Sequence, residues 1–118
     1  MKFDTDMEDD TKFEAIDIKA AMVFRAARTA LGWSQQDTAT HSGLAKTTIA
    51  RIETASGQNS LSNVHALIST YQLHGIEISN LMQDSVTIAI NEHALHEAAR
   101  NLANPDRKRR DSGKKRSQ

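Results

Sequence analysis

The sequence predicts a mainly α-helical fold, in which a bundle of four to five helices is followed by a short β-hairpin and a last helix. Three observations predict it. Aliphatic residues recur at three- and four-residue steps through most of the 118-residue chain, the period of a helix buried on one side. After Gly75 the period becomes two, as in a strand, and it becomes helical again past Asn91. Aromatic residues make up only 4% of the chain, so the core must be aliphatic.

The first helix follows an acidic segment. Residues 1–14 offer no face that could be packed, so we expect a disordered arm there. The helix begins at about Glu14 and ends at Gly32, because glycine commonly follows the last helical residue. Its apolar stripe comprises Ile16, Ala20, Val23, Phe24, Ala27 and Leu31.

Two short helices separated by a glycine come next. Ser34 is a good N-cap for the first of them, and Gly43 interrupts that helix after barely two turns. The second covers about residues 45–54 and directs Ile49 and Ile52 inward. A short helix, a glycine turn and a second helix allow two helices to cross at a steep angle, since glycine readily adopts the left-handed backbone that the turn needs.

A fourth helix begins after a small, polar loop at residues 56–60. The last residue of the loop, Ser60, is a good N-cap, and the helix stops near Gly75. Its apolar stripe comprises Leu61, Val64, Leu67, Ile68 and Tyr71.

Two alternating apolar segments, at residues 76–78 and 86–90, predict a β-hairpin. A two-stranded hairpin is marginal alone because it buries little and leaves its edges unpaired. Pairing with the same element of a second chain would remove both problems. We therefore expect a homodimer whose interface uses the apolar hairpin residues Ile76, Ile78, Val86, Ile88 and Ile90.

The last predicted helix begins after Asn91, a good N-cap, and ends before Pro105. We expect the basic residues beyond it to form a disordered tail. Three roles are open for this tail: a solubilising end, an auxiliary clamp on phosphates, or a docking site for a partner protein. The apolar stripe of the last helix comprises Ala94, Leu95, Ala98, Ala99 and Leu102.

Charge and composition narrow the class of protein. The 15 basic and 15 acidic residues balance, but residues 1–18 hold seven acids against two bases and residues 105–118 hold seven bases against two acids. The sequence has neither a run long enough for a membrane span nor the pattern of a signal peptide. It has no cysteine for a disulfide or a thiolate zinc site. We expect a soluble, cytoplasmic protein with no membrane partner.

The sequence patterns do not indicate an enzyme. We find no glycine-rich phosphate loop, no nucleophile elbow and no motif that places a pair of carboxylates. His93 shares a helix face with His96 or with Glu97, three and four residues further on, as a pair of metal ligands can, but the spacing is not that of zincins and no third ligand is evident. We therefore expect a surface helix face there, and neither a metal nor a cofactor.

The segment at residues 35–53, QQDTATHSGLAKTTIARIE, carries the functional information. With Ile49 and Ile52 directed inward, the outer side of the third helix is exposed and can enter the major groove of DNA. The residues on that outer side are Ala45, Lys46, Thr47, Ala50, Arg51 and Thr54.

This stretch resembles the Cro/phage-repressor-type (lambda-repressor-like) helix-turn-helix family over roughly residues 16–74. Thr38 departs from the family pattern, which has a large aliphatic residue there, and Ser42 stands where an apolar residue is common. The residues that carry the resemblance are Arg28, Gly32-Trp33-Ser34-Gln35, Ala39, Gly43-Leu44, Ile49 and Arg51-Ile52-Glu53.

The resemblance implies roles for individual residues. It implies a structural ion pair between Arg28 and Glu53, and a phosphate contact by Gln35. Residues of the third helix would face the bases, and the loop at residues 58–60 would touch phosphates. The whole predicted DNA-binding set is Gln35, Gln36, Ala45, Lys46, Thr47, Thr48, Arg51, Gln58, Asn59 and Ser60.

The predicted function is sequence-specific binding of double-stranded DNA as a homodimer on a two-fold operator, in the role of a transcriptional repressor. The predicted organisation is an arm (1–14), a DNA-binding domain (15–75), a dimerisation segment (76–104) and a tail (105–118). One alternative is an antitoxin that binds its own promoter and neutralises a toxin. Another is a module that binds proteins through the motif helix. Besides DNA and a second copy of the chain, the candidate partners include a toxin or an anti-repressor.

Overall fold

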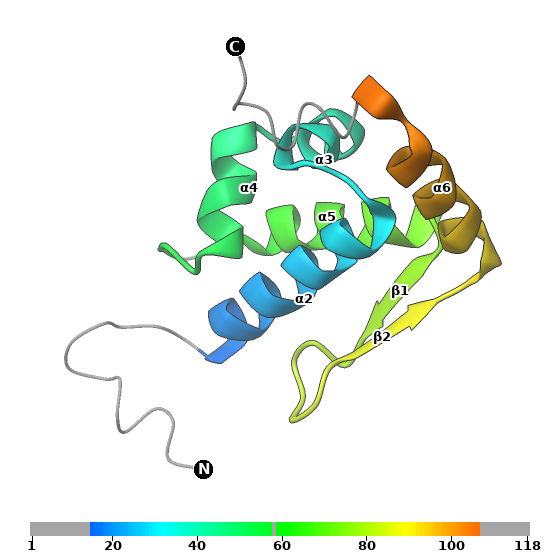
Figure 1. Cartoon of the computed structure of the whole chain (residues 1–118). Coiled ribbons are helices and arrows are strands. Elements are labelled where there is room, and N and C mark those ends of the chain that lie inside the picture. Colours follow the sequence, from blue (N-terminus) through cyan, green and yellow to red (C-terminus); the bar gives the residue numbers. More distant parts are fainter. Residues whose placement is uncertain (1–14, 58, 107–118) are drawn as a thin grey trace.

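The computed structural model describes residues 15–57 and 59–106 of the chain. The predictions for residues 1–14, for Gln58 and for residues 107–118 lie outside this described part. The described residues form a mainly helical fold with a small antiparallel hairpin, which confirms the predicted architecture (Figure 1). The elements in chain order are α2 (Ala15–Leu31), α3 (Gln35–Ser42), α4 (Lys46–Glu53), α5 (Leu61–Leu73), β1 (Ile76–Ser79), β2 (Thr87–Ile90) and α6 (Glu92–Ala103).

Local caps set the boundaries of α3. The Ser34 hydroxyl accepts a hydrogen bond from the backbone N–H of Asp37, and the Asp37 carboxylate accepts one from the backbone N–H of Ser34. This reciprocal pair satisfies donors that a helix N-terminus would otherwise leave open. At the other end Gly43 takes the left-handed conformation, with φ of 80°, and its N–H donates to the carbonyl of Ala39. The turn predicted at this glycine is present.

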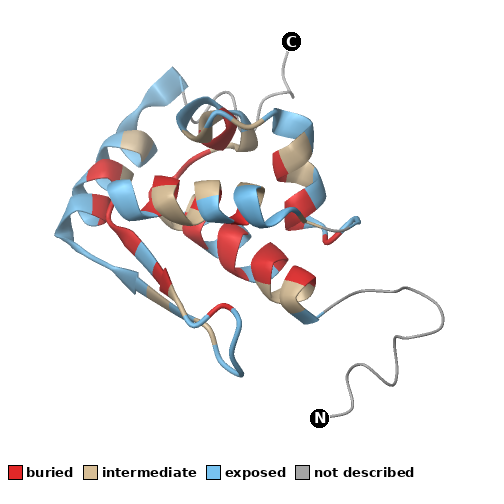
Figure 2. Cartoon of the chain, turned by 180° about the vertical axis from the view of Figure 1, so that it is seen from behind, coloured by how far each residue is buried: buried red, intermediate tan, exposed pale blue. Residues whose placement is uncertain are grey.

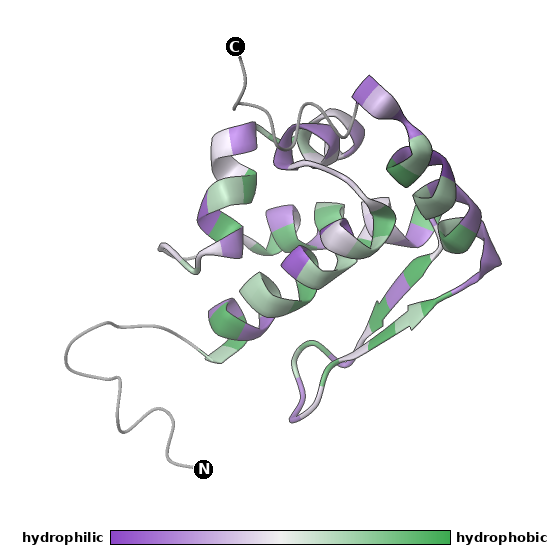
Figure 3. Cartoon of the chain, viewed as in Figure 1, coloured by the Kyte–Doolittle hydropathy of each residue, from purple (hydrophilic) through white to green (hydrophobic). Residues whose placement is uncertain are grey.

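The core lies around α2, which runs through the middle of the molecule between α4 on one side and α6 on the other (Figure 1). Its inner face is buried, and the buried residues continue along α5 and β1 (Figure 2). Figure 3 shows that the hydrophobic residues follow the same course along the strands and parts of α2 and α5. The largest fully buried apolar side chains are Phe24, Leu31, Ile49, Ile52, Leu67, Tyr71 and Ile76.

Thr38, which stands where the resemblance implies a large aliphatic residue, is fully buried in this core. Its hydroxyl lies 3.3 Å from the phenol oxygen of Tyr71, at hydrogen-bonding distance. Burial raises the pKa of Tyr71 to about 12, against the smaller opposing effect of the Thr38 hydrogen bond. A polar pair therefore links α3 to α5 where the resemblance noted in the sequence implies an aliphatic contact.

The hairpin packs one face onto its own chain. In its register Ile76 lies opposite Ile90 and Ile78 lies opposite Ile88. Ile76 and Ile78 are buried because β1 packs against α5, which corrects the prediction that both residues are available to a second chain. Val86 and Ile88 are half-buried, and only Ile90, with 57% of its surface exposed, lies mostly open.

The apolar stripe predicted for α6 is only partly correct. Ala94 is buried, but Leu95 and Leu102 are 60% and 63% exposed. The inner face instead carries Glu97 and the half-buried Asn101, whose side-chain amide donates to the carbonyl of Leu31 at 2.8 Å. Polar contacts to distant parts of the chain therefore set the rotation of this helix. Within residues 15–57 and 59–106, no helix is long and apolar enough to cross a membrane.

Candidate nucleic-acid interface

Helix α4 is anchored on one side and open on the other. Ile49 and Ile52 are almost fully buried, and Glu53 at the end of the helix is buried as well. The inner side of α4 packs against α2 and α3. These three buried residues lie on one side of an eight-residue helix and fix its rotation about its axis. The residues on the opposite side therefore face solvent in fixed positions.

A network of charged hydrogen bonds joins α2, α3 and α4 at the base of this element. Arg28 Nε donates to Glu53 Oε2 at 2.7 Å and Arg28 Nη2 donates to Oε1 at 3.0 Å, so the pair is bidentate. Arg28 Nη1 also donates to the carbonyl of Trp33 at 3.0 Å. Gln35 Nε2 donates to Glu53 Oε1 at 3.1 Å. The structure thus pairs Arg28 with Glu53, and it gives the Gln35 side chain a structural contact in addition to the phosphate contact expected for it.

The solvent side of α4 carries most of the predicted base-facing residues. Ala45, Lys46, Thr47 and Arg51 are exposed, and Thr48 is half-buried. Ala45 is the N-cap residue, and no side chain of the described residues caps this end of α4. The backbone N–H groups of the first turn, with the positive end of the helix dipole, are therefore suited to an anion such as a phosphate.

The remaining predicted residues lie around α4 with different degrees of exposure. Gln36 is exposed on α3, and its amide lies 3.5 Å from the Thr40 hydroxyl. Ser60 is exposed, but its hydroxyl accepts the N–H of Asn63 and so caps α5. Asn59 is half-buried, and within the described part of the chain its Nδ2 has no hydrogen-bond partner. This Nδ2 atom is itself buried, so the structure does not present it to solvent as the predicted phosphate contact would require.

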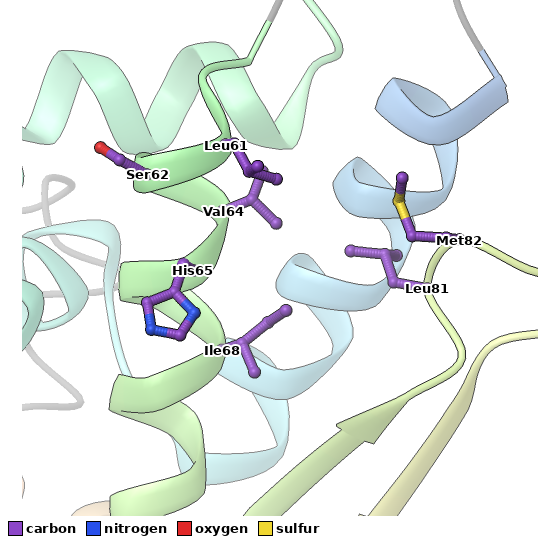
Figure 4. Close-up of a pocket in the computed structure, with 7 residues that line it drawn as sticks. All are labelled: Leu61, Ser62, Val64, His65, Ile68, Leu81 and Met82. Atoms are coloured by element: carbon purple, nitrogen blue, oxygen red, sulfur yellow. The ribbon is translucent and has the colours of Figure 1, made fainter.

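Two apolar hollows lie away from α4. One, of about 530 Å³, lies between α5 and the turn after β1, and Figure 4 shows its lining residues. Its rim is exposed, with Leu61 77% and Met82 75% accessible. The other, of about 330 Å³, lies between α2 and β2 and is lined in part by Val86 and Ile88. These hollows place apolar surface on the hairpin side of the molecule and not on the α4 side.

Sequence reasoning missed one cluster of side chains. His74, at the end of α5, lies beside His93 and Glu97 of α6, so that three groups able to bind a metal come together. His96, which the sequence grouped with His93 and Glu97, is exposed and is not part of this cluster. Nothing in the local spacing indicates His74, because the hairpin separates α5 from α6 along the chain.

Comparison with known proteins identifies the family. The sequence model of the helix-turn-helix domain matches residues 20–81, which is more than half of the chain, so the chain belongs to that family. The class that the fold and the exposed face of α4 define is therefore that of helix-turn-helix DNA-binding regulators. Searches of curated proteins and of solved structures returned no match.

Proposed function

We propose that the protein is a transcriptional regulator of the Cro/phage-repressor type, which binds double-stranded DNA sequence-specifically and acts by binding, not by catalysis. The observation that carries this proposal is the division of α4 into an anchored side and an exposed side. Ile49 and Ile52 fix the helix, while Lys46, Thr47 and Arg51 project outward. A helix held in this way fits the major groove with its first turn against the DNA.

The chemistry of the exposed residues suits two kinds of contact. Arg51 can form a bidentate pair with the O6 and N7 acceptors of guanine. Lys46 lies in the uncapped first turn of α4, where its ammonium group and the backbone N–H groups together favour a phosphate or a guanine edge. Thr47 offers a hydroxyl and a methyl group, which suit a thymine or a phosphate.

Selection of bound sequences from a random DNA pool tests this function, and the recovered sequence then serves as the probe for variants. Lys46→Ala and Arg51→Ala should each weaken binding by about 1–3 kcal/mol if the side chain reads a base. If it contacts phosphate, the loss should be uniform across sequences and the salt dependence should become shallower. Arg100→Ala is the matched control, since this exposed arginine lies on α6, across α2 from α4 (Figure 1). Unchanged affinity in both α4 variants would contradict the proposal.

We also propose that the protein binds as a homodimer on a two-fold operator and represses transcription. One domain offers few base-reading side chains, and a second copy doubles the discrimination. Half-sites should lie about one helical turn, roughly 34–36 Å, apart. The exposed apolar residues Ile90 and Met22, near β2 and the hollow beside it, supply surface for the second chain.

Light scattering tests the dimer. Ile90→Asp should yield a monomer that binds the operator weakly, because Ile90 is exposed and its replacement spares the core. Thr87→Asp is the matched control, since successive odd and even positions of a strand point to opposite faces. A dimer that survives Ile90→Asp would place the interface elsewhere. In a reporter assay, the regulator should lower transcription from a promoter that contains the operator.

The second candidate function is that of an antitoxin. The observation that favours it is the apolar hollow rimmed by Leu61 and Met82, whose lining residues come from α5 and the turn after β1 and not from α4 (Figure 4). Coexpression with the product of the neighbouring reading frame tests it. An antitoxin should relieve growth arrest caused by that product, and Met82→Asp should abolish the relief while DNA affinity stays unchanged. A neighbouring product that does not arrest growth would contradict this function.

A further inference from the structure

A group of nitrogen and oxygen ligands joins the end of α5 to the first turns of α6. Each of His74, His93 and Glu97 offers one ligand atom, and these three atoms lie within 4.8 Å of one another. Glu97 is buried, His74 is half-buried and His93 is exposed. Glu97 and His74 are therefore held in place by the protein, whereas the exposed His93 can change its side-chain conformation.

The backbone holds the two halves of the group together without any ligand. Gly75, directly after His74, takes a left-handed conformation with φ of 94°. Its carbonyl accepts the N–H of Asn91 at 2.9 Å, and Asn91 in turn caps α6 through the N–H of Ala94. This arrangement fixes the start of α6 against the end of α5. His93 and Glu97 are four residues apart, so they project from the same face of α6.

Glu97 is held as a carboxylate that faces the rest of the group. Its Oε2 accepts the indole N–H of Trp33 at 3.0 Å, and its Oε1 lies 2.6 Å from His74 Nδ1. Burial alone would raise the pKa of Glu97, but the hydrogen bond and the charge of His74, with the hydrogen bond of Trp33, outweigh it, and the pKa is lowered. A hydrogen-bonded, oriented carboxylate is the form in which carboxylates bind metals.

We propose that His74, His93 and Glu97 bind a divalent first-row transition metal, with zinc as the ion of reference. Two imidazoles and one carboxylate, with no thiolate, form a donor set that suits such ions and does not favour calcium or magnesium. Bond lengths of about 2.0–2.2 Å in a tetrahedral site place ligand atoms roughly 3.3–3.6 Å apart. The His74–Glu97 contact must open slightly and His93 must approach, which its exposure permits.

The bound ion would tie α6 to the helix-turn-helix domain. The ring of His74 makes an edge contact with the ring of Trp33, at 4.7 Å between centroids, and Trp33 stacks on His41 of α3 at 4.4 Å. Trp33 thus acts as a positioning residue, because it orients Glu97 and lies against His74. It is the only tryptophan of the chain, so its fluorescence reports on the site.

The test is a calorimetric titration of the untagged full chain, freed of metal by chelation, with zinc chloride. We expect one equivalent to bind with saturation and the melting temperature to rise with it. His93→Ala should weaken binding at least about tenfold and abolish the rise in melting temperature. Because His93 is exposed, the variant should keep its fold, which circular dichroism checks. His96→Ala, three residues along the same exposed helix, is the matched control and should bind like the parent.

A second readout does not depend on stability. Copper(II) bound at this site should quench Trp33 fluorescence with the same stoichiometry, and His93→Ala should require at least about tenfold more copper for the same effect. The proposal is overturned if the full chain does not bind zinc or copper with saturation. It is also overturned if His93→Ala and His96→Ala weaken binding equally, which would indicate scattered surface histidines.

Discussion

Replacing Arg28 with alanine should destabilise the fold strongly, because it leaves a buried carboxylate without its charged partner. The Glu53 side chain is 2% exposed and the Arg28 side chain is 18% exposed, so the pair belongs to the buried class of ion pairs. Removing one partner of such a pair costs about 3–5 kcal/mol, whereas an exposed pair contributes about 0–1 kcal/mol. The amide of Gln35, the other side chain hydrogen-bonded to Glu53 in the described structure, carries no charge to replace the guanidinium.

The structure also shows which contacts the loss of Arg28 removes. Arg28 gives Glu53 two hydrogen bonds, at 2.7 and 3.0 Å, and gives the Trp33 carbonyl a third at 3.0 Å. Since native domains are stable by about 5–15 kcal/mol, the variant should lose about a fifth of its stability or more. The double variant Arg28→Ala, Glu53→Ala should recover part of this loss, because it removes the unpaired charge as well.

Urea unfolding followed by circular dichroism measures these differences. Arg25→Ala is the matched control, since Arg25 is exposed on the same helix and its loss should change stability by no more than about 0.5 kcal/mol. A loss below about 1 kcal/mol for Arg28→Ala would refute the reasoning, and so would a double variant that is less stable than Arg28→Ala alone.

Four further predictions concern stability. Gly75→Ala should cost at least about 2 kcal/mol in urea unfolding, because at φ of 94° its new Cβ would lie 2.3 Å from Asn91 Oδ1. Gly43→Ala, at φ of 80° with open space among the described residues, should cost only about 1–2 kcal/mol. The folded state raises the pKa of Tyr71 to about 12, so this group stabilises the parent fully below pH 10, and the stabilisation is lost as the pH approaches 12. The unfolding free energy of the parent should therefore fall by roughly 2–3 kcal/mol between pH 10 and pH 12, and Tyr71→Phe should not show this fall. Parallel pH profiles of the two proteins would contradict this. Ser34→Ala should cost about 0.5–2 kcal/mol in thermal or urea unfolding by removing the α3 cap.

Elements that depend only on neighbouring residues could be predicted from the amino-acid sequence alone. The apolar period located α2, α4 and α5, and Ser34 and Gly43 located the ends of α3, because caps and helical periods act within a few residues. The pattern of α4 also predicted which of its residues face inward, since Ile49 and Ile52 are the only large apolar residues that it has. These local features were enough to predict the helix-turn-helix element.

How the later elements pack against the rest of the chain could not be predicted in this way, because it depends on residues that are distant in sequence. Glu97 turns inward because Trp33 and His74, distant in sequence, supply its hydrogen bonds, and Leu95 is left outside. Ile76 turns toward its own core because α5 covers β1. The repeat of apolar residues along a helix or strand predicts which residues share a face. It does not predict which other element that face will contact, because this depends on residues from the whole chain.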